Sequence, residues 1–245
     1  MVARDMPSAR SRHAAVPLGG GLWLFGGARF DGASITLFND VHVLDVDARS
    51  PRWHTPHLNG TRPPPPRSGH SATLLEDERT VVVFGGDGGT SAPDASEGYL
   101  NDVWTFDFMG VWTQRKPTGK PPAPRTLHTA TRVGEWLAVM GGDVTGGDSS
   151  GAAAMVVHVL QLHSWHWQQP SLHGGALPHR IAHQAVLLGD VLLLSGGLSA
   201  TGLEGAASKL GAVIDGMTEI RIPKCPDCGS HGSCALGQCV CGADR

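Results

Sequence analysis

Two short motifs recur four times, always in the same order, along the 245 residues of the chain. An Arg-x-x-His motif, preceded within three residues by proline, is found at Arg10, Arg67, Arg125 and Arg180. A Gly-Gly pair that ends an apolar run follows each motif, and its first glycine is Gly26, Gly85, Gly141 or Gly196. A nearly constant interval of this kind is typical of chains built from one stacked supersecondary unit. The sequence therefore predicts four structural repeats, at residues 7–60, 61–117, 118–171 and 172–222.

The second repeat shows most clearly what each unit contains. The run Thr80–Phe84 is too short for a helix and ends in Gly85-Gly86, which predicts a buried strand that stops at a turn. Residues 101–107 alternate between two faces, with Val103 on one and Trp104 on the other, and this is the period of a strand. We expect a four-stranded antiparallel sheet that stacks on its neighbours, because one such sheet cannot bury both of its faces alone.

Later landmarks of the repeat weaken toward the C-terminus. Asn-Asp-Val occurs at Asn39 and Asn101, but the corresponding segments of the third and fourth repeats begin at Met155 and Ala212. Tryptophans that we expect to pack between sheets close the first three repeats, at Trp53, Trp112 and Trp167. The fourth repeat has no tryptophan. It is therefore expected to be degenerate or shortened.

Taken in this fixed order, the motifs make residues 7–222 resemble the kelch repeat, a unit of roughly 50 residues that forms one blade of a β-propeller. The resemblance implies an all-β fold: a kelch-type β-propeller, or an open array of about four four-stranded blades. Kelch propellers usually have five to seven blades, so four repeats imply either a small ring or an arc. The resemblance also implies structural roles for Arg67, His70, Gly85, Gly86, Asp102 and Trp112.

Four segments that follow the glycine pairs are expected to be loops, at Ala28–Leu37, Asp87–Gly98, Asp143–Ala153 and Leu198–Gly211. Loops on a rigid β scaffold are where binding residues usually lie. The larger or charged side chains in these segments are the binding candidates Arg29, Phe30, Asp87, Glu97, Tyr99 and Asp143. The same loops could instead be solvated connectors, and turn formation explains the aspartates beside glycine as well as a calcium site would.

Several classes of function are disfavoured by the sequence. A net charge of −3 without a Lys/Arg-rich run argues against nucleic-acid partners. The longest apolar stretch, Ala185–Leu194, is about half the length of a membrane span. Gly-x-Ser-x-Gly and phosphate-loop motifs are missing, and the copper-radical oxidases of the kelch type need two tyrosines where this chain has only Tyr99. We therefore expect no catalysis, no cofactor, no metal, and a protein or glycan ligand.

All five cysteines lie between Cys225 and Cys241. Their spacing resembles the EGF-like module of the tenascin and teneurin type, and the sequence ends before the sixth cysteine of that pattern. The resemblance implies that residues 223–245 are a truncated, disulfide-rich module, with the pairs Cys225–Cys234 and Cys228–Cys239 and with Cys241 lacking its partner here. The alternative is a zinc site that uses these thiolates and His231, although Cys-x-Cys is a poor second half for a tetrahedral site.

Disulfides imply an oxidising compartment, yet residues 1–10 show no signal peptide. Asn59 begins a sequon and is a glycosylation candidate. Our leading hypothesis is a fragment of a secreted or membrane-anchored protein, of an arrangement that resembles attractin-type ectodomains, acting as a non-catalytic protein-binding or adhesion scaffold. One alternative is an intracellular, cytoplasmic kelch adaptor with a zinc-binding or reduced tail. Another is the recognition region of a larger enzyme whose catalytic domain lies beyond residue 245.

Overall fold

The computed structural model describes residues 5–47, 49–60, 62–89, 98–144, 155–170, 177–199, 214, 216–221, 232–235 and 238–241. The chain divides into two compact units, each with an interior of its own. Unit 1 comprises Met1–Lys116, Pro122–Leu127 and Asp143–Gly146. Unit 2 comprises Pro117–Pro121, His128–Gly142 and Gly147–Arg245.

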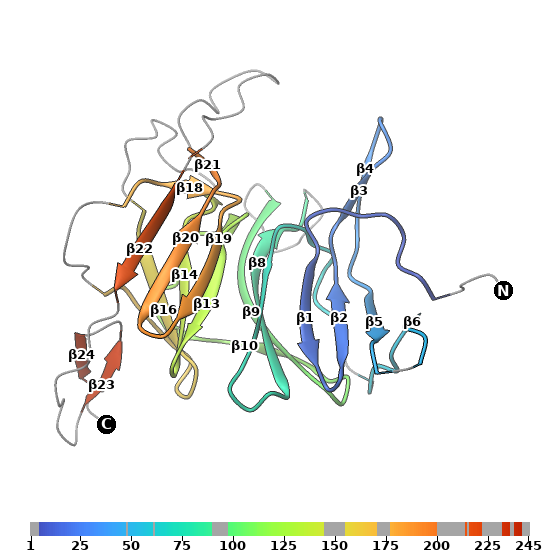
Figure 1. Cartoon of the computed structure of the whole chain (residues 1–245), viewed down its shortest axis with the longest axis horizontal. Helices are drawn as coiled ribbons and strands as arrows, with labels where there is room; N and C mark the ends of the chain where they lie inside the picture. Colours follow the sequence, from blue (N-terminus) through green and yellow to red (C-terminus); the bar gives the residue numbers. More distant parts are fainter. Residues whose placement is uncertain are drawn as a thin grey trace. The chain divides into compact units, whose positions relative to one another are not determined.

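Unit 1 contains two four-stranded antiparallel sheets, which confirms the predicted repeat unit for the first half of the chain (Figure 1). Blade 1 has the order β1-β2-β5-β6, with β1 Ala14–Leu18, β2 Gly21–Phe25, β5 Val41–Asp45 and β6 Arg52–His54. Blade 2 has the order β10-β9-β8-β7, with β7 Ser71–Leu74, β8 Thr80–Asp87, β9 Tyr99–Asp107 and β10 Trp112–Arg115. Two short pairs complete the unit: β3 Ala28–Phe30 with β4 Ile35–Leu37, and β12 Arg125–Thr126 with β15 Asp143–Val144.

Unit 2 repeats this plan with variations. Blade 3 is a five-stranded sheet of order β11-β17-β16-β14-β13, with β11 Thr118–Gly119, β13 Thr129–Val133, β14 Trp136–Met140, β16 Val157–Gln161 and β17 His166–Gln168. Blade 4 has three strands among the described residues, β19 Gln184–Leu188, β20 Val191–Ser195 and β22 Met217–Arg221. The remaining pairs are β18 Arg180–Ile181 with β21 Leu198–Ser199, and β23 Gly232–Ala235 with β24 Gln238–Cys241.

Two expectations about where strands stop were wrong. In blade 2 the glycine pair does not end the strand: β8 runs through it to Asp87, with a register shift between Phe84 and Gly86. Gly85 and Gly86 both have positive φ, so they form an irregularity after which pairing with β9 resumes. The segment Ala28–Leu37, expected to be a loop, instead forms the β3–β4 hairpin.

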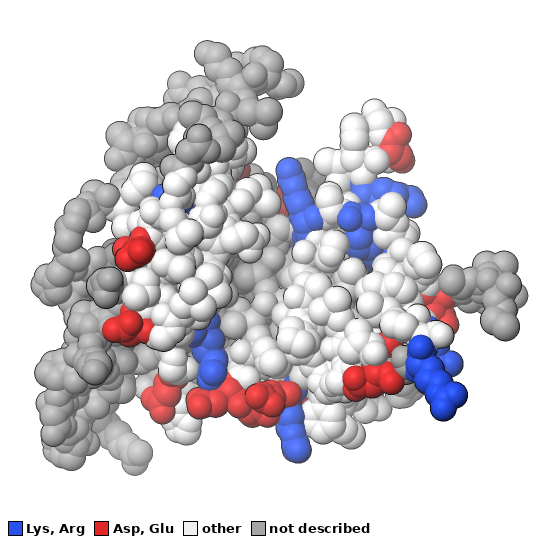
Figure 2. All heavy atoms as spheres, in the orientation of Figure 1, with Lys and Arg blue, Asp and Glu red and all other residues white. Residues whose placement is uncertain are grey.

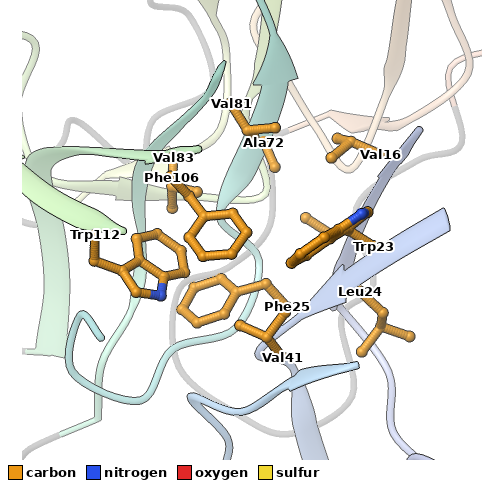
Figure 3. A pocket seen from close by; sticks show the side chains of 11 residues that line it. Val16, Trp23, Leu24, Phe25, Val41, Ala72, Val81, Val83, Phe106 and Trp112 are labelled. Atoms are coloured by element: carbon orange, nitrogen blue, oxygen red, sulfur yellow. The ribbon is translucent and has the colours of Figure 1, made fainter. Parts of the chain in front are cut away.

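The interior of unit 1 lies between blades 1 and 2 and is aromatic. The Phe25 and Trp112 rings lie 4.8 Å apart between centroids, and the Phe106 and Trp112 rings 4.5 Å apart. Figure 3 shows these rings around a small cavity with Trp23 and aliphatic side chains. The interior of unit 2 lies between blades 3 and 4 and is mostly aliphatic, with Met140, Leu192 and Leu194 beside Trp136 among its buried residues. Trp112 and Trp167 are buried as expected, but Trp53 is only half-buried.

The glycine pair and the Arg-x-x-His motif recur together because they meet where two blades pack. Gly26 of blade 1 has φ +63°, and a Cβ on it would lie 2.8 Å from the Arg67 carbonyl oxygen and 2.9 Å from His70 Cε1 of blade 2. Gly141 of blade 3 has φ +60°, and a Cβ on it would collide with the same two atoms of Arg180 and His183 in blade 4. The first glycine of one blade is therefore a socket for the Arg-x-x-His loop of the next blade.

The motif arginine also ties its own blade together. Arg67 is fully buried and donates to both carboxylate oxygens of Asp102, at 2.7 and 2.9 Å, and to the Gly85 carbonyl oxygen at 3.0 Å. Arg10 makes the corresponding two-point pair with Asp40 in blade 1. In both blades the carboxylate is the aspartate of Asn-Asp-Val, so the arginine links two landmarks of the repeat.

Candidate binding surface of unit 1

The β3–β4 hairpin presents an apolar pair to solvent. Phe30 and Ile35 are opposite one another in its antiparallel register, and 69% and 68% of their surfaces are exposed. Opposite residues on paired strands point to the same side, so the two side chains form one patch. The hairpin extends beyond the end of the blade 1 sheet (Figure 1). Large apolar side chains that are exposed in this way are typical of a surface that binds another protein.

A tight turn fixes the shape of this hairpin. The Asp31 carboxylate accepts hydrogen bonds from the backbone N–H groups of Ser34 at 2.8 Å and Ala33 at 3.0 Å, and from the Ser34 hydroxyl at 2.9 Å. The hydrogen bond from the Ser34 backbone, followed by the other two, lowers the pKa of Asp31. Because its turn is tied down by a charged acceptor, the hairpin holds Phe30 and Ile35 in a defined orientation.

A second group of side chains is assembled around Tyr99, at the start of β9. The Tyr99 hydroxyl donates to Asp143 Oδ2 at 2.6 Å, and Asp87 is opposite Tyr99 in the β8–β9 register. Burial, then the hydrogen bond to Asp143 and the charges of Asp143 and Asp87, raise the pKa of the Tyr99 phenol. The phenol therefore stays protonated at neutral pH and acts as a hydrogen-bond donor, not as a nucleophile.

Arg12 belongs to this group, and sequence reasoning missed it. Its charge opposes the rise in the Tyr99 pKa, so it lies within electrostatic reach of the phenol. Arg12 is exposed and has φ 55°, a left-handed conformation that is costly for a residue with a Cβ. Arg12 is the third residue of the first Arg-x-x-His motif. Gly69 and Leu127 hold the same position in the second and third motifs, and their backbones are also left-handed. The glycine at this position of the second repeat is the signal that could have marked Arg12 as unusual.

Backbone hydrogen bonds connect these left-handed positions within unit 1. The Gly69 N–H donates to the Arg12 carbonyl oxygen, and the Leu127 N–H donates to the Gly69 carbonyl oxygen, each at 2.8 Å. Asp87 is held by backbone hydrogen bonds with Ser68, at 2.7 and 2.9 Å. The residues of the Tyr99 group are thus attached to the ordered backbone of the repeat motif.

The hairpin and the Tyr99 group adjoin one another. The Asp87 carboxylate accepts a hydrogen bond from the Gly89 N–H at 2.9 Å. A Cβ on Gly89 would lie 3.1 Å from Leu37 Cδ1, at the end of β4. Unit 1 therefore presents a single surface, with Phe30 and Ile35 on the hairpin and Arg12, Asp87, Tyr99 and Asp143 beside its base. Figure 2 shows basic and acidic side chains close together on and around the hairpin, not a patch of one sign.

The predicted site residues are distributed as follows. Arg29 and Phe30 lie on β3, while Asp87, Tyr99 and Asp143 come together in the second group. Glu97 lies outside the described residues. Among the described residues, no three histidine, cysteine or acidic side chains are grouped so as to hold a metal ion. The described part of the chain also contains no helix long and apolar enough to cross a membrane.

The glycosylation predicted at Asn59 and the predicted disulfides stay predictions. Asn59 is exposed, and its side-chain amide donates to the Met109 carbonyl oxygen at 2.5 Å. Cys225 and Cys228 lie outside the described residues. Cys234 and Cys239 are opposite one another in the β23–β24 backbone register, whereas the proposed pairing joins each of them to a different cysteine.

The small cavity inside unit 1 is not a candidate ligand site. Figure 3 shows that its walls are the aromatic and aliphatic side chains of the blade 1 and blade 2 interior. A site for a specific small molecule needs a few convergent polar groups to orient the ligand, and these walls offer almost none. The cavity is a gap in core packing.

The described blades, antiparallel sheets that repeat one plan in both units, define the class as a β-propeller-type repeat fold. The family model described as the KLHDC2/KLHL20/DRC7 kelch-repeats domain matches residues 1–197. The chain therefore belongs to the kelch-repeat family. The fold is also similar to the solved structure titled "Structure of YjhT", with a TM-score of 0.58 and 16% identity over 78% of this chain and 60% of that one.

Several relatives with longer chains are similar to most of this chain. Adagio-like protein 1 of Oryza sativa subsp. japonica is 31% identical over 79% of this chain and 29% of its own length. The Rab9 effector protein with kelch motifs of Rattus norvegicus is 30% identical over 80% of this chain and 50% of its own length. The serine/threonine-protein phosphatase BSL2 of Arabidopsis thaliana is 30% identical over 86% of this chain and 20% of its own length. The chain thus spans half or less of the length of these relatives.

Proposed function

We propose that this chain is a non-catalytic protein-binding scaffold that binds its partner through the surface of unit 1. The observation that carries the proposal is the Phe30–Ile35 pair, which is about two-thirds exposed on a hairpin whose turn is fixed by Asp31. Membership of the kelch family, whose domain is a protein-interaction fold, supports the general role.

The chemistry of the surface indicates how a partner would bind. Aromatic and large aliphatic side chains supply most of the energy at the centre of an interface, and polar groups at its rim fix the orientation. Phe30 and Ile35 suit the first role. Arg12, Tyr99 and the two aspartates beside it suit the second, because they offer both donors and acceptors to a protein backbone or to charged side chains.

The relatives support an intracellular compartment more than the tail supports a secreted one. Protein-binding functions inside cells fit a Rab9 effector and a flagellar dynein chain, the latter 32% identical over 79% of this chain and 4% of its own length. The adhesion version, with an EGF-like tail in the secretory pathway and a glycan ligand, draws no support from these relatives, and the family match ends at residue 197. Mass spectrometry of alkylated native protein tests it, since free thiols at Cys225 and Cys234 would argue for the intracellular alternative.

A photo-crosslinking experiment tests the binding surface. A photoreactive phenylalanine derivative is placed at Phe30 and, as a matched control, at Phe108, which is 42% exposed elsewhere on unit 1. In extracts of native cells we expect a saturable protein adduct from position 30 only. Unlabelled wild-type chain should compete for it, and the Phe30→Thr/Ile35→Thr variant should not. Equal adducts at both positions, or competition by the variant, would contradict the proposal.

A further inference from the structure

The backbone of the β3–β4 hairpin directs part of its hydrogen-bonding groups away from the hairpin. Ala28 exchanges two hydrogen bonds with Ser11, each of 2.9 Å, so its N–H and C=O point away from β4. Opposite residues of an antiparallel ladder alternate between hydrogen-bonded and non-hydrogen-bonded pairs. Because Ala28 is opposite Leu37, and Phe30 two residues on is opposite Ile35, both pairs are non-hydrogen-bonded and their backbone groups point outward.

The two edges of the hairpin differ in how many of these outward groups are in use. On β3, Ala28 is already paired with Ser11, which leaves Phe30 as the outward residue. On β4, the outward residues are Ile35 and Leu37, and no hydrogen bond joins their outward groups to another residue in the part of the chain that the structure describes. This β4 edge therefore offers two successive sets of backbone donors and acceptors to a further strand.

The side chains of the hairpin strands are sorted between two faces. Arg29 and Thr36 are opposite one another, lie on the same face and are both exposed. The residues that alternate with them along β3 and β4 lie on the other face. This apolar face consists of Ala28, Phe30, Ile35 and Leu37. A strand added at the β4 edge would therefore meet apolar side chains on one face and a basic side chain on the other.

We propose, on the basis of the function proposed above, that the partner contributes an extended segment that pairs with the β4 edge as a further strand. In strand addition, backbone hydrogen bonds supply affinity and alternate side chains supply specificity. The segment's residues beside Ile35 and Leu37 lie on the apolar face and extend the patch formed by Phe30 and Ile35. The residue between them lies on the face of Arg29, so the segment alternates apolar and acidic side chains.

Two backbone esters in the 245-residue chain test the pairing without changing a side chain. Leu37 or Phe30 is replaced by the α-hydroxy acid with the same side chain, which turns the peptide N–H into an ester oxygen. The first ester removes an outward N–H from the β4 edge, and the second removes one from the β3 edge. Each also weakens one carbonyl of the inner Arg29–Thr36 pair, so the two variants are matched in their effect on the hairpin itself.

The probe is the partner peptide captured by the photoreactive derivative at position 30, sequenced from the adduct by mass spectrometry and then synthesised. We expect its sequence to alternate apolar and acidic residues. It should bind the Leu37 ester about tenfold more weakly than wild type, and the Phe30 ester as tightly as wild type, because only the first ester removes a hydrogen bond to the added strand. Fluorescence anisotropy of the labelled peptide measures the three affinities.

The outcomes separate strand addition from the proposed binding function. Equal affinities for all three chains, or equal weakening by both esters, would overturn strand addition at the β4 edge while binding through the Phe30 and Ile35 side chains still stood. A captured segment that is basic, or that comes from a second copy of this chain, would overturn it as well. The lack of a saturable adduct at position 30 would instead contradict the proposed function, and strand addition with it.

Discussion

Units 1 and 2 are built on the same sheet plan but are stabilised by different chemistry. The interior of unit 1 contains the Phe25, Phe106 and Trp112 rings among aliphatic side chains, and the motif arginines Arg10 and Arg67 are paired with Asp40 and Asp102. The interior of unit 2 is mostly aliphatic apart from Trp136, and Arg180 donates to the Thr218 hydroxyl at 2.8 Å where blades 1 and 2 have a carboxylate. In both units the first glycine of the pair packs against the carbonyl oxygen of the next motif arginine. The group that accepts hydrogen bonds from the arginine side chain differs between the units.

The largest expected difference between the units concerns their buried arginines. Arg67→Met should lower the free energy of unfolding by about 3–5 kcal/mol, because it leaves the Asp102 carboxylate without its charged partner and with only the Trp104 N–H as donor. Arg180→Met should cost about 1–3 kcal/mol, because it leaves only neutral acceptors, Thr218 and the Gly196 carbonyl. Urea unfolding measures both losses. A greater loss for Arg180→Met would mean that the two arginines do not differ in the way described.

The junction glycines should instead behave alike in the two units. Gly26→Ala and Gly141→Ala each force a left-handed conformation on alanine and a collision with the next blade, for a cost of about 2–4 kcal/mol. Gly189→Ala is the control: it has the same left-handed conformation in open space and should cost about 1–2 kcal/mol. If all three variants unfold at the same urea concentration, the socket is not a structural requirement.

Acid should destabilise unit 2 more than unit 1. Burial, helped by the charges of Arg180 and His179, lowers the pKa of His183 to about 4 from its ordinary 6.5. The unfolded chain therefore binds a proton that the folded chain excludes, and stability present above pH 6.5 is lost as the pH falls toward 4, by at most about 3 kcal/mol.

Asp40 of unit 1 responds in a lower pH range. Burial acts to raise its pKa, but the hydrogen bonds from Arg10 and His42 outweigh burial and lower it. Its contribution is therefore present above its ordinary pKa and is lost only in stronger acid. Burial, then the charge of Arg10, also lowers the pKa of His13 beside β1, but less than that of His183. Hydrogen exchange at about pH 7 and pH 5 should therefore show faster opening of β19 and β20 at the lower pH, with a smaller change in β1 and β2. His183→Gln should remove the difference, and an equal response of all four strands would speak against this assignment.

The sequence predicted the repeated sheets because the glycine pair and the motif arginine depend on close backbone packing, which few residues permit. The sequence did not predict the contacts between residues that are far apart along the chain. Tyr99 and Asp143 are 44 residues apart and meet only because β12 pairs with β15. Arg12 escaped notice because it occupies a glycine-like position without being glycine. The β3–β4 hairpin looked like a loop, since its strands have three residues each.

The most direct test of the account is to measure stability and partner capture together for Phe30→Thr/Ile35→Thr. The exposed pair contributes little to the fold, so the free energy of unfolding should change by less than about 1 kcal/mol while capture of the crosslinked partner is lost. A variant that is strongly destabilised but still captures the partner would show that the hairpin serves the fold and that recognition lies elsewhere.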